Sequence, residues 1–299
     1  MSLEYLKVIL TRIGEIYASQ LPAIIGLAVL FTALVIFEGQ ASSPGKVWWR
    51  NPGLVTDICY ALINSVLAPY LRIPIFLLIF FIISGTLSKT AIEDYFNNGR
   101  GLLHGLSFWW QAAIYLLLTD FFLYWIHRSF HFTSLWKYHA IHHSAEQVEW
   151  TTSYRIHPVN MMLQQSLVAV LMIMLGISPE VMAFFIPWDV FSAAFVHANV
   201  KWSFGPLKYV IATPVFHRWH HCLPGDGGDK NFAPTFAFYD VLFGTFYMPE
   251  GRLPQAFGVD EREFPQDYLR QLAYPFRTLQ TRLTHNAAET GRSPASTAN

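Results

Sequence analysis

Long runs of apolar residues are the feature that most constrains how this chain can fold. Such runs occur at Leu21–Phe37, Val55–Leu71, Ile73–Leu87 and Phe108–Ile126, the second and third separated only by Arg72. Each run approaches the roughly 20 residues that an α-helix needs to cross a bilayer. Only 13% of the 299 residues are charged, against about a quarter in a soluble domain. The chain is therefore predicted to be an all-α, multi-span membrane protein.

The segments around these runs complete the predicted organisation. Residues 1–20 place apolar side chains at helical spacing between charged ones, which predicts an amphipathic helix at the membrane interface. A further apolar block, Asn160–Val196, is interrupted by Gly176-Ile-Ser-Pro179, so we expect a helical hairpin there. The tail after about Asn286 has no large apolar residue to bury and is expected to be disordered.

Histidines are concentrated in the polar segments that flank the predicted hairpin. A pair spaced by four residues lies in YWIHRSFHF, and triplets with spacings of three and four lie in KYHAIHHS and FHRWHH. On a helix, this spacing turns the imidazoles of one cluster toward one region. Because a hairpin returns to the side it starts from, histidines before and after it can meet. The candidate metal ligands are His127, His131, His139, His142, His143, His157, His197, His217, His220 and His221.

Two further histidines are not expected to bind metal. His104 precedes the predicted span Phe108–Ile126, which places it on the opposite membrane face, and His285 borders the tail. The only two cysteines, Cys59 and Cys222, form neither a disulfide framework nor a thiolate metal site. The formal net charge is zero, which gives no indication of a nucleic-acid partner.

The number and type of these ligands indicate the chemistry. Ten imidazoles exceed the needs of one ion, since zinc takes about four ligands and octahedral ions about six, so two metal ions are predicted. Neutral imidazoles leave the charge of the ions uncompensated, and at a membrane surface this favours iron, dioxygen and attack on an inert lipid C–H bond. The alternatives are a zinc-dependent lipid hydrolase with a base such as Glu146, and a non-enzymatic metal transporter or sensor.

The motifs, taken in order, resemble those of the fatty acid hydroxylase and sterol desaturase superfamily of membrane non-haem di-iron enzymes. The resemblance covers about residues 108–250, through DFFLYWIHRSFH, LWKYHAIHHS, SYRIHP, HAN, FHRWHH, KNFA and YDVLFGTFY. It implies that the pair and both triplets bind two iron ions, with His157 and His197 as accompanying histidines. It also implies a lipid hydroxylase or desaturase that uses O2 and two electrons from an external ferredoxin or cytochrome with its reductase.

On this basis we expect three regions: an amphipathic helix with membrane spans at 1–107, a fatty acid hydroxylase-like catalytic domain at 108–250, and a C-terminal segment with the disordered tail at 251–299. The larger basic, polar face is the better candidate for the cytoplasmic side, where the active site is then expected. Among neighbouring polar residues, Asp120 and Tyr124 are candidates to orient His127, and Asp240 to orient a histidine or cap a helix. Glu146 and Glu149 are expected in a solvated turn. The apolar helices do not distinguish sterols from acyl chains, carotenoids or alkyl lipids.

Overall fold

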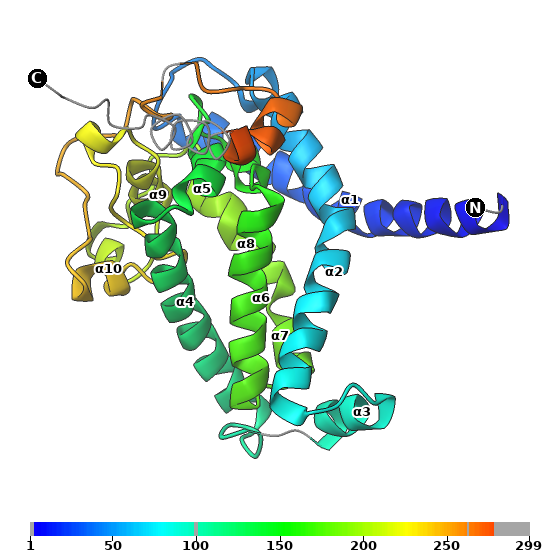
Figure 1. Ribbon diagram of the computed structural model, residues 1–299. Helices are drawn as coiled ribbons and strands as arrows, with labels where there is room; N and C mark the ends of the chain where they lie inside the picture. The colour runs from blue at the N-terminus through cyan, green and yellow to red at the C-terminus, as the bar shows by residue number, and fades with distance from the viewer. Residues whose placement is uncertain (1–2, 99–100, 262, 278–299) are drawn as a thin grey trace, which may run out of the picture.

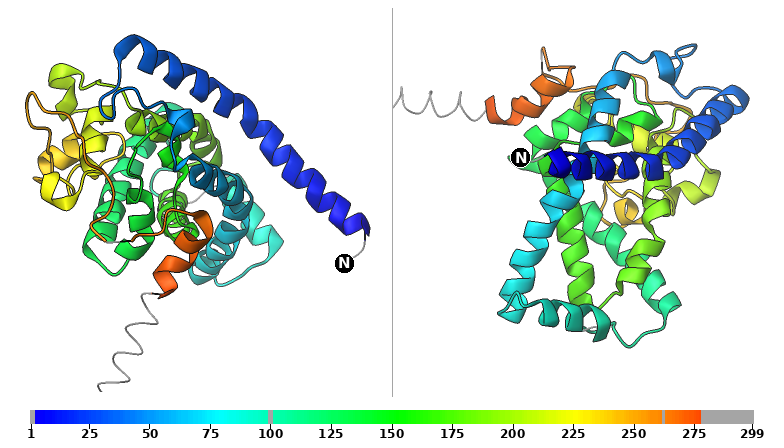
Figure 2. Two further views of the ribbon diagram at one scale, coloured as in Figure 1. Left: turned by 90° about the horizontal axis from the view of Figure 1, so that it is seen from above. Right: turned by 90° about the vertical axis from the view of Figure 1, so that its right-hand side faces the viewer.

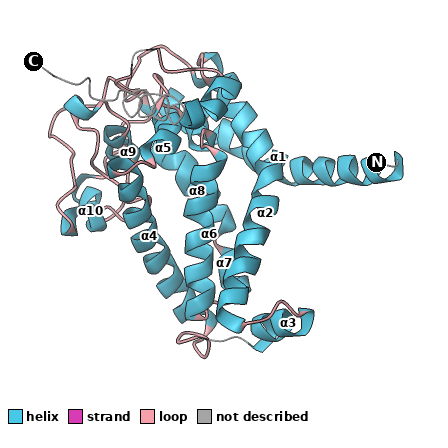
Figure 3. Cartoon of the chain, viewed as in Figure 1, coloured by secondary structure: helices cyan, strands magenta, loops and turns pink. Residues whose placement is uncertain are grey.

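The computed structural model describes residues 3–98, 101–261 and 263–277, and all of its named elements are helical (Figure 3). In chain order these are α1 (Leu3–Glu38), η1 (Trp48–Arg50), α2 (Leu54–Ser84), α3 (Lys89–Asn98), α4 (Phe108–Phe132), α5 (Trp136–His143), η2 (Trp150–Tyr154), α6 (Pro158–Leu175), α7 (Pro179–Phe184), α8 (Ile186–His197), η3 (Gly205–Tyr209), α9 (Pro214–His220), η4 (Pro224–Asp226) and α10 (Phe238–Leu242). The predicted all-α class is confirmed. The predicted disordered tail and His285 lie outside the described residues.

The long helices α2, α4 and α6 run together as a bundle, and the short helices α5 and α9 lie over one end of it as a cap (Figure 1). Among the described residues, four segments are long and apolar enough to cross a membrane: Thr11–Glu38, Leu54–Ser84, Pro158–Leu175 and Pro179–His197. The chain is thus an integral membrane protein with the cap at one end of its apolar helices.

Helix α2 corrects one sequence-based expectation. The two apolar runs that Arg72 separates, Val55–Leu71 and Ile73–Leu87, form one continuous helix that ends at Ser84 and is capped by Gly85 in the left-handed conformation. Arg72 does not interrupt the helix, because arginine is a good helix former, and its guanidinium donates a hydrogen bond to Gln165 of α6. At about 1.5 Å per residue the 31-residue helix is roughly 46 Å long, which exceeds the roughly 30 Å hydrocarbon core.

Helix α1 corrects a second expectation. The amphipathic segment 1–20 and the predicted span Leu21–Phe37 form one helix, Leu3–Glu38. Both views of Figure 2, together with Figure 1, show this helix lying crosswise to α2, α4 and α6 rather than alongside them. Its second half packs on the cap, where Leu27 and Phe31 are buried in a cluster with Trp150 and Ala198. Burial against the cap therefore sets the direction of α1.

The predicted hairpin is confirmed by the path from α6 to α8. Helix α6 ends at Gly176, whose φ of 89° suits a residue without a Cβ. The Ser178 side chain then accepts a hydrogen bond from the Val181 amide and starts α7, and α8 returns to the cap at His197. His104 lies near the turn of the hairpin, since the neighbouring Leu103 amide donates to the Leu175 carbonyl at 2.8 Å. His104 is thus far from the cap, as predicted.

Candidate metal centre

Nine of the ten candidate histidines meet in two groups beneath the cap. The first histidine group contains His127, His131, His139, His143 and His220, and the second histidine group contains His142, His197, His217 and His221. Within each group, one ring nitrogen per histidine lies within 4.8 Å of every other. The two groups contain imidazoles only, without a carboxylate or a thiolate.

Each histidine triplet is divided between the two groups. In α5, His139 and His143 face the first group while His142 faces the second. In α9 the arrangement is reversed, because His220 faces the first group and the other two face the second. The reason is helical geometry: residues four apart share a face, whereas consecutive residues point about 100° apart. The expectation that each triplet converges on one region is therefore corrected.

Hydrogen bonds at the Nδ1 atoms fix three rings of the first histidine group. The Nδ1 atoms of His127 and His220 lie 2.7 Å from the carbonyl oxygens of Phe232 and Lys230. The Nδ1 atom of His131 lies 2.7 Å from Asp229 Oδ1. These three acceptors belong to the segment 229–232, where Asp229 and Asn231 adopt positive φ values of 61° and 58°. Asp and Asn tolerate that conformation better than other non-glycine residues.

Three further Nδ1 atoms lie beside a side-chain amide or a backbone carbonyl near a helix end. His139 Nδ1 lies 2.8 Å from Oδ1 of Asn160, whose amide nitrogen donates to Gln164. In the second group, His142 Nδ1 lies 3.2 Å from the Arg155 carbonyl oxygen, and His197 Nδ1 lies 2.6 Å from the Ala193 carbonyl oxygen. Sequence reasoning missed Asp229 and Asn160 because they are distant in sequence from the histidines they contact.

The protonation pattern shows that the two groups fit metal ions. A carbonyl oxygen only accepts, so a ring nitrogen beside it must carry the proton, and the other nitrogen then presents a lone pair. His142 Nε2 and His197 Nε2 both present lone pairs yet lie 3.1 Å apart, and His127 Nε2 and His139 Nε2 lie 2.9 Å apart. Two lone pairs cannot form a hydrogen bond. A cation between them removes the conflict, and two nitrogens each about 2.1 Å from one ion and at right angles are about 3 Å apart.

Buried nitrogens without a partner support the same conclusion. Nε2 of His131 and Nε2 of His220 have no hydrogen-bond partner among the described residues, although both rings are anchored at Nδ1. Burial, reinforced by the neighbouring imidazoles, also lowers the pKa of the histidines in α5 and at α9 far below the usual value; these are His139, His142, His143, His217, His220 and His221. Neutral imidazole is the form that binds metal.

His157 lies outside both groups. Its Nδ1 accepts a hydrogen bond from the Val159 amide at 3.1 Å and thereby caps the start of α6. Its Nε2 lies 3.2 Å from the Leu272 carbonyl oxygen. Because both ring nitrogens are engaged elsewhere, the geometry does not support His157 as a metal ligand.

Polar residues near the groups act on the segments that hold the histidines. Asp120 accepts hydrogen bonds from the amides of Thr235 and Phe236 at 2.8 Å, so it anchors that loop instead of orienting His127. Asp240 accepts from the amide of Phe232 at 2.8 Å. Since the Phe232 carbonyl faces His127, Asp240 orients this histidine indirectly through the loop.

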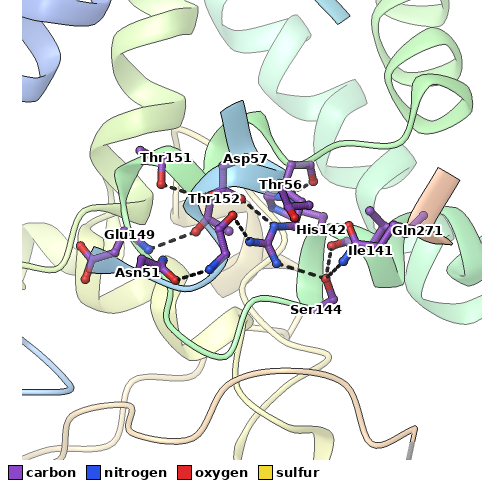
Figure 4. A network of polar contacts seen from close by, with 12 residues as sticks. Asn51, Thr56, Asp57, Ile141, His142, Ser144, Glu149, Thr151, Thr152 and Gln271 are labelled. Carbon is purple, nitrogen blue, oxygen red and sulfur yellow. Dashed lines mark hydrogen bonds and ion pairs between the residues drawn. The ribbon is translucent and has the colours of Figure 1, made fainter. Parts of the chain in front are cut away.

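A buried ion pair connects the second histidine group to α2. Arg155 Nε donates to Asp57 Oδ1 at 2.6 Å, and both side chains are 1% exposed. Thr151 donates to the other carboxylate oxygen at 2.8 Å. Figure 4 shows the polar network to which Asp57, Thr151, Ser144 and His142 belong. Through the Arg155 carbonyl, the pair holds the backbone that faces His142 Nδ1.

Glu149 is buried, although it was expected in a solvated turn, whereas Glu146 is exposed as expected. Glu149 is 2% exposed and accepts hydrogen bonds from Asn199 Nδ2 at 2.9 Å and Gln147 Nε2 at 3.1 Å. Burial raises its pKa, while the nearby Arg218 opposes that rise. Arg218 is itself fully buried and donates to the carbonyls of Val148 and His197. Glu149 therefore belongs to the buried support of the second group.

Comparison with known proteins agrees with this site. The fatty acid hydroxylase family model matches residues 112–245. An ornithine lipid hydroxylase from Rhizobium tropici is 30% identical over 167 residues, covering 56% of this chain and 50% of the relative. An alkylglycerol monooxygenase from Homo sapiens is 32% identical over 138 residues, covering 46% and 30% respectively. A Delta(7)-sterol 5(6)-desaturase from Gibberella zeae is 27% identical over 169 residues, covering 53% and 43%.

The chain spans half or less of the length of these relatives. No solved structure matches it. All nine grouped histidines lie within the segment that the family model matches. The segment that carries the ordered motifs and both imidazole groups is therefore similar to the fatty acid hydroxylase family and to these relatives.

Proposed function

We propose that this chain is a membrane-bound di-iron oxygenase that hydroxylates or desaturates a C–H bond of a lipid, using O2 and two electrons from an external donor. The observation that carries the proposal is the division of nine histidines, eight of them buried, into two groups in which ring nitrogens face each other as lone pairs. Five imidazoles would hold one iron and four the other. A ferredoxin or cytochrome with its reductase is the proposed electron donor.

The composition of the site supports iron and oxidation. Imidazoles suit iron, and without carboxylates they leave the charge of the ions uncompensated. Iron held in this way supplies redox chemistry with dioxygen, which is what attack on an unactivated C–H bond requires. At six of the nine rings, the protein keeps the Nδ1 proton on an oxygen acceptor, so that Nε2 is free to bind and the ring cannot turn.

The position of the site supports a lipid substrate. His127 follows the apolar part of α4, and His197 is the last residue of α8, so both groups lie at the ends of apolar helices. Phe130 and Phe232 are buried beside the first group, where their rings exclude water. The names of the relatives include an ornithine lipid, an alkylglycerol and a sterol, which agrees with a lipid substrate.

The membrane arrangement follows from the direction of the helices. We propose that α2, α4 and the hairpin of α6 to α8 enter the bilayer, with the cap and the active site on the cytoplasmic face. Because α1 lies crosswise to these helices (Figure 1), it would lie at the interface rather than span the membrane.

Metal analysis tests the function directly. We expect about two irons per chain by plasma mass spectrometry, coupled in Mössbauer spectra of iron-57-enriched protein. His142→Ala and His220→Ala should each lower the iron content, whereas His104→Ala, at the far end of the bundle, should leave it unchanged. Stoichiometric zinc after iron-replete expression, with no O2 consumption on reduction, would refute the oxygenase and favour the zinc hydrolase.

A further inference from the structure

A pocket of about 380 Å³ lies on the cap, outside both histidine groups. Its walls come from residues 201–208, from α9 and from residues 248–253. Three cations, Lys201, Lys208 and Arg252, line it together with one carboxylate, Glu250. Within the described part of the chain, none of these four side chains takes part in a salt bridge. The pocket thus has a net charge of +2, three positive minus one negative, and suits an anion.

Trp219 lines the same pocket and carries a buried hydrogen-bond donor. This side chain is 3% exposed, and no residue that the structure describes bonds to its indole Nε1. Its ring packs edge-on against Tyr247, with centroids 5.3 Å apart, and the Arg252 guanidinium lies 6.0 Å from the ring centroid. A buried donor without a partner is costly and rare. An oxygen atom of a ligand in the pocket would satisfy it.

The neighbouring segment η3 places the pocket at the membrane boundary. The Phe204 ring stacks on Phe195 near the end of the apolar helix α8, with centroids 6.1 Å apart and planes at 17°. Around Lys208, η3 and its flanks expose a row of apolar side chains, each more than a third exposed: Phe204, Leu207, Tyr209, Val210 and Ile211. Exposed apolar residues beside cations are typical of segments that lie in the headgroup region.

We propose that this pocket binds the phosphate group of an anionic phospholipid from the bilayer on which the cap rests. Lys208 and Arg252 would pair with the phosphate, and the Trp219 indole N–H would donate to one of its oxygens. The exposed apolar residues of η3 would lie beside the glycerol and the acyl chains. That apolar rim is what favours a lipid over a soluble phosphate. The site is separate from the metal centre and does not depend on the proposed oxidation.

Native mass spectrometry of the full-length protein tests the proposal. The protein is equilibrated with equimolar phosphatidylcholine and phosphatidylglycerol, and the retained lipids are counted. We expect wild type to retain phosphatidylglycerol selectively. Each cation near a membrane surface changes anionic lipid binding about five-fold, so Lys208→Ala with Arg252→Ala should lower the selectivity about 25-fold. Glu250→Gln should raise it. Lys89→Ala, an exposed lysine of α3 at the other end of the bundle, serves as the matched control.

Two results would overturn the proposal. One is equal selectivity in wild type, the double variant and Glu250→Gln, with helical content and metal content unchanged. The other is complete displacement of phosphatidylglycerol by millimolar inorganic phosphate, which would identify a site for free phosphate. Metal content is measured on the same samples, so failure of this site is distinguishable from failure of the di-iron assignment. Because Glu250→Gln acts in the opposite direction, misfolding of the double variant alone cannot produce the expected pattern.

Discussion

Removing the carboxylate from the buried Asp57–Arg155 pair should destabilise the protein strongly. Asp57→Asn keeps the size of the side chain and leaves the Arg155 guanidinium, 1% exposed, without its counter-charge. Breaking one partner of a buried ion pair typically costs about 3–5 kcal/mol. At about 2–4 °C per kcal/mol for a chain of comparable size, the thermal midpoint in detergent should fall by roughly 6–20 °C.

An exposed ion pair of the same chemistry provides the control. Lys89 and Glu93 lie 3.5 Å apart with side chains 88% and 53% exposed, so Glu93→Gln should cost at most about 1 kcal/mol. Replacing both buried partners, as in Asp57→Leu with Arg155→Met, should restore part of the stability because no charge is left unpaired. Asp57→Asn should also lower the metal content of the second histidine group, since Arg155 carries the carbonyl that faces His142. A midpoint within about 2 °C of both wild type and Glu93→Gln would refute this reasoning.

Three further predictions concern the histidines. Asn160→Ala removes the oxygen that faces His139 Nδ1 and should weaken metal binding about 10–100-fold in chelator competition, whereas Asn160→Asp keeps an acceptor and should bind nearly as wild type. Asp229→Ala should weaken metal binding by a similar factor through His131, and Asp229→Asn should weaken it less. Equal metal affinities of these two variants would contradict a role for the hydrogen bond between His131 Nδ1 and Asp229. Burial lowers the pKa of the six triplet histidines on folding, so acid protonates the unfolded chain preferentially. The metal-free protein should therefore keep its thermal midpoint above about pH 6.5 and lose stability as the pH falls below it, and a midpoint that rises toward pH 5 would contradict this assignment.

Local features were predictable from the sequence because they depend on nearby residues. The apolar runs predicted a helical membrane protein, and Gly176 with Pro179 predicted the turn between α6 and α8. The hairpin argument also placed His197 beside the triplets, although it is 24 residues from His221. The histidine motifs and the hairpin named ten candidates, and nine of them meet, whereas His157 does not.

Other features depend on contacts between distant segments. The guanidinium of Arg72, within α2, donates its hydrogen bond to Gln165 of α6. Helix α1 lies crosswise because Leu27 and Phe31 pack on Trp150 of the cap. Glu149 is buried because Asn199, 50 residues away, meets its carboxylate.

The same distinction applies to the metal centre. The directions of its histidines within one helix depend on local sequence, because an HxxHH segment places two histidines on one helical face and one about 100° away. Which face turns toward which group was decided only when α4, α5, α8 and α9 packed together. The tautomer of a ring with an acceptor at Nδ1 was likewise decided by tertiary packing, as with Asp229 for His131 or Asn160 for His139. Sequence therefore determined which side chains can bind metal, whereas tertiary structure decided how they divide between two ions, because that division depends on helix directions that no local pattern records.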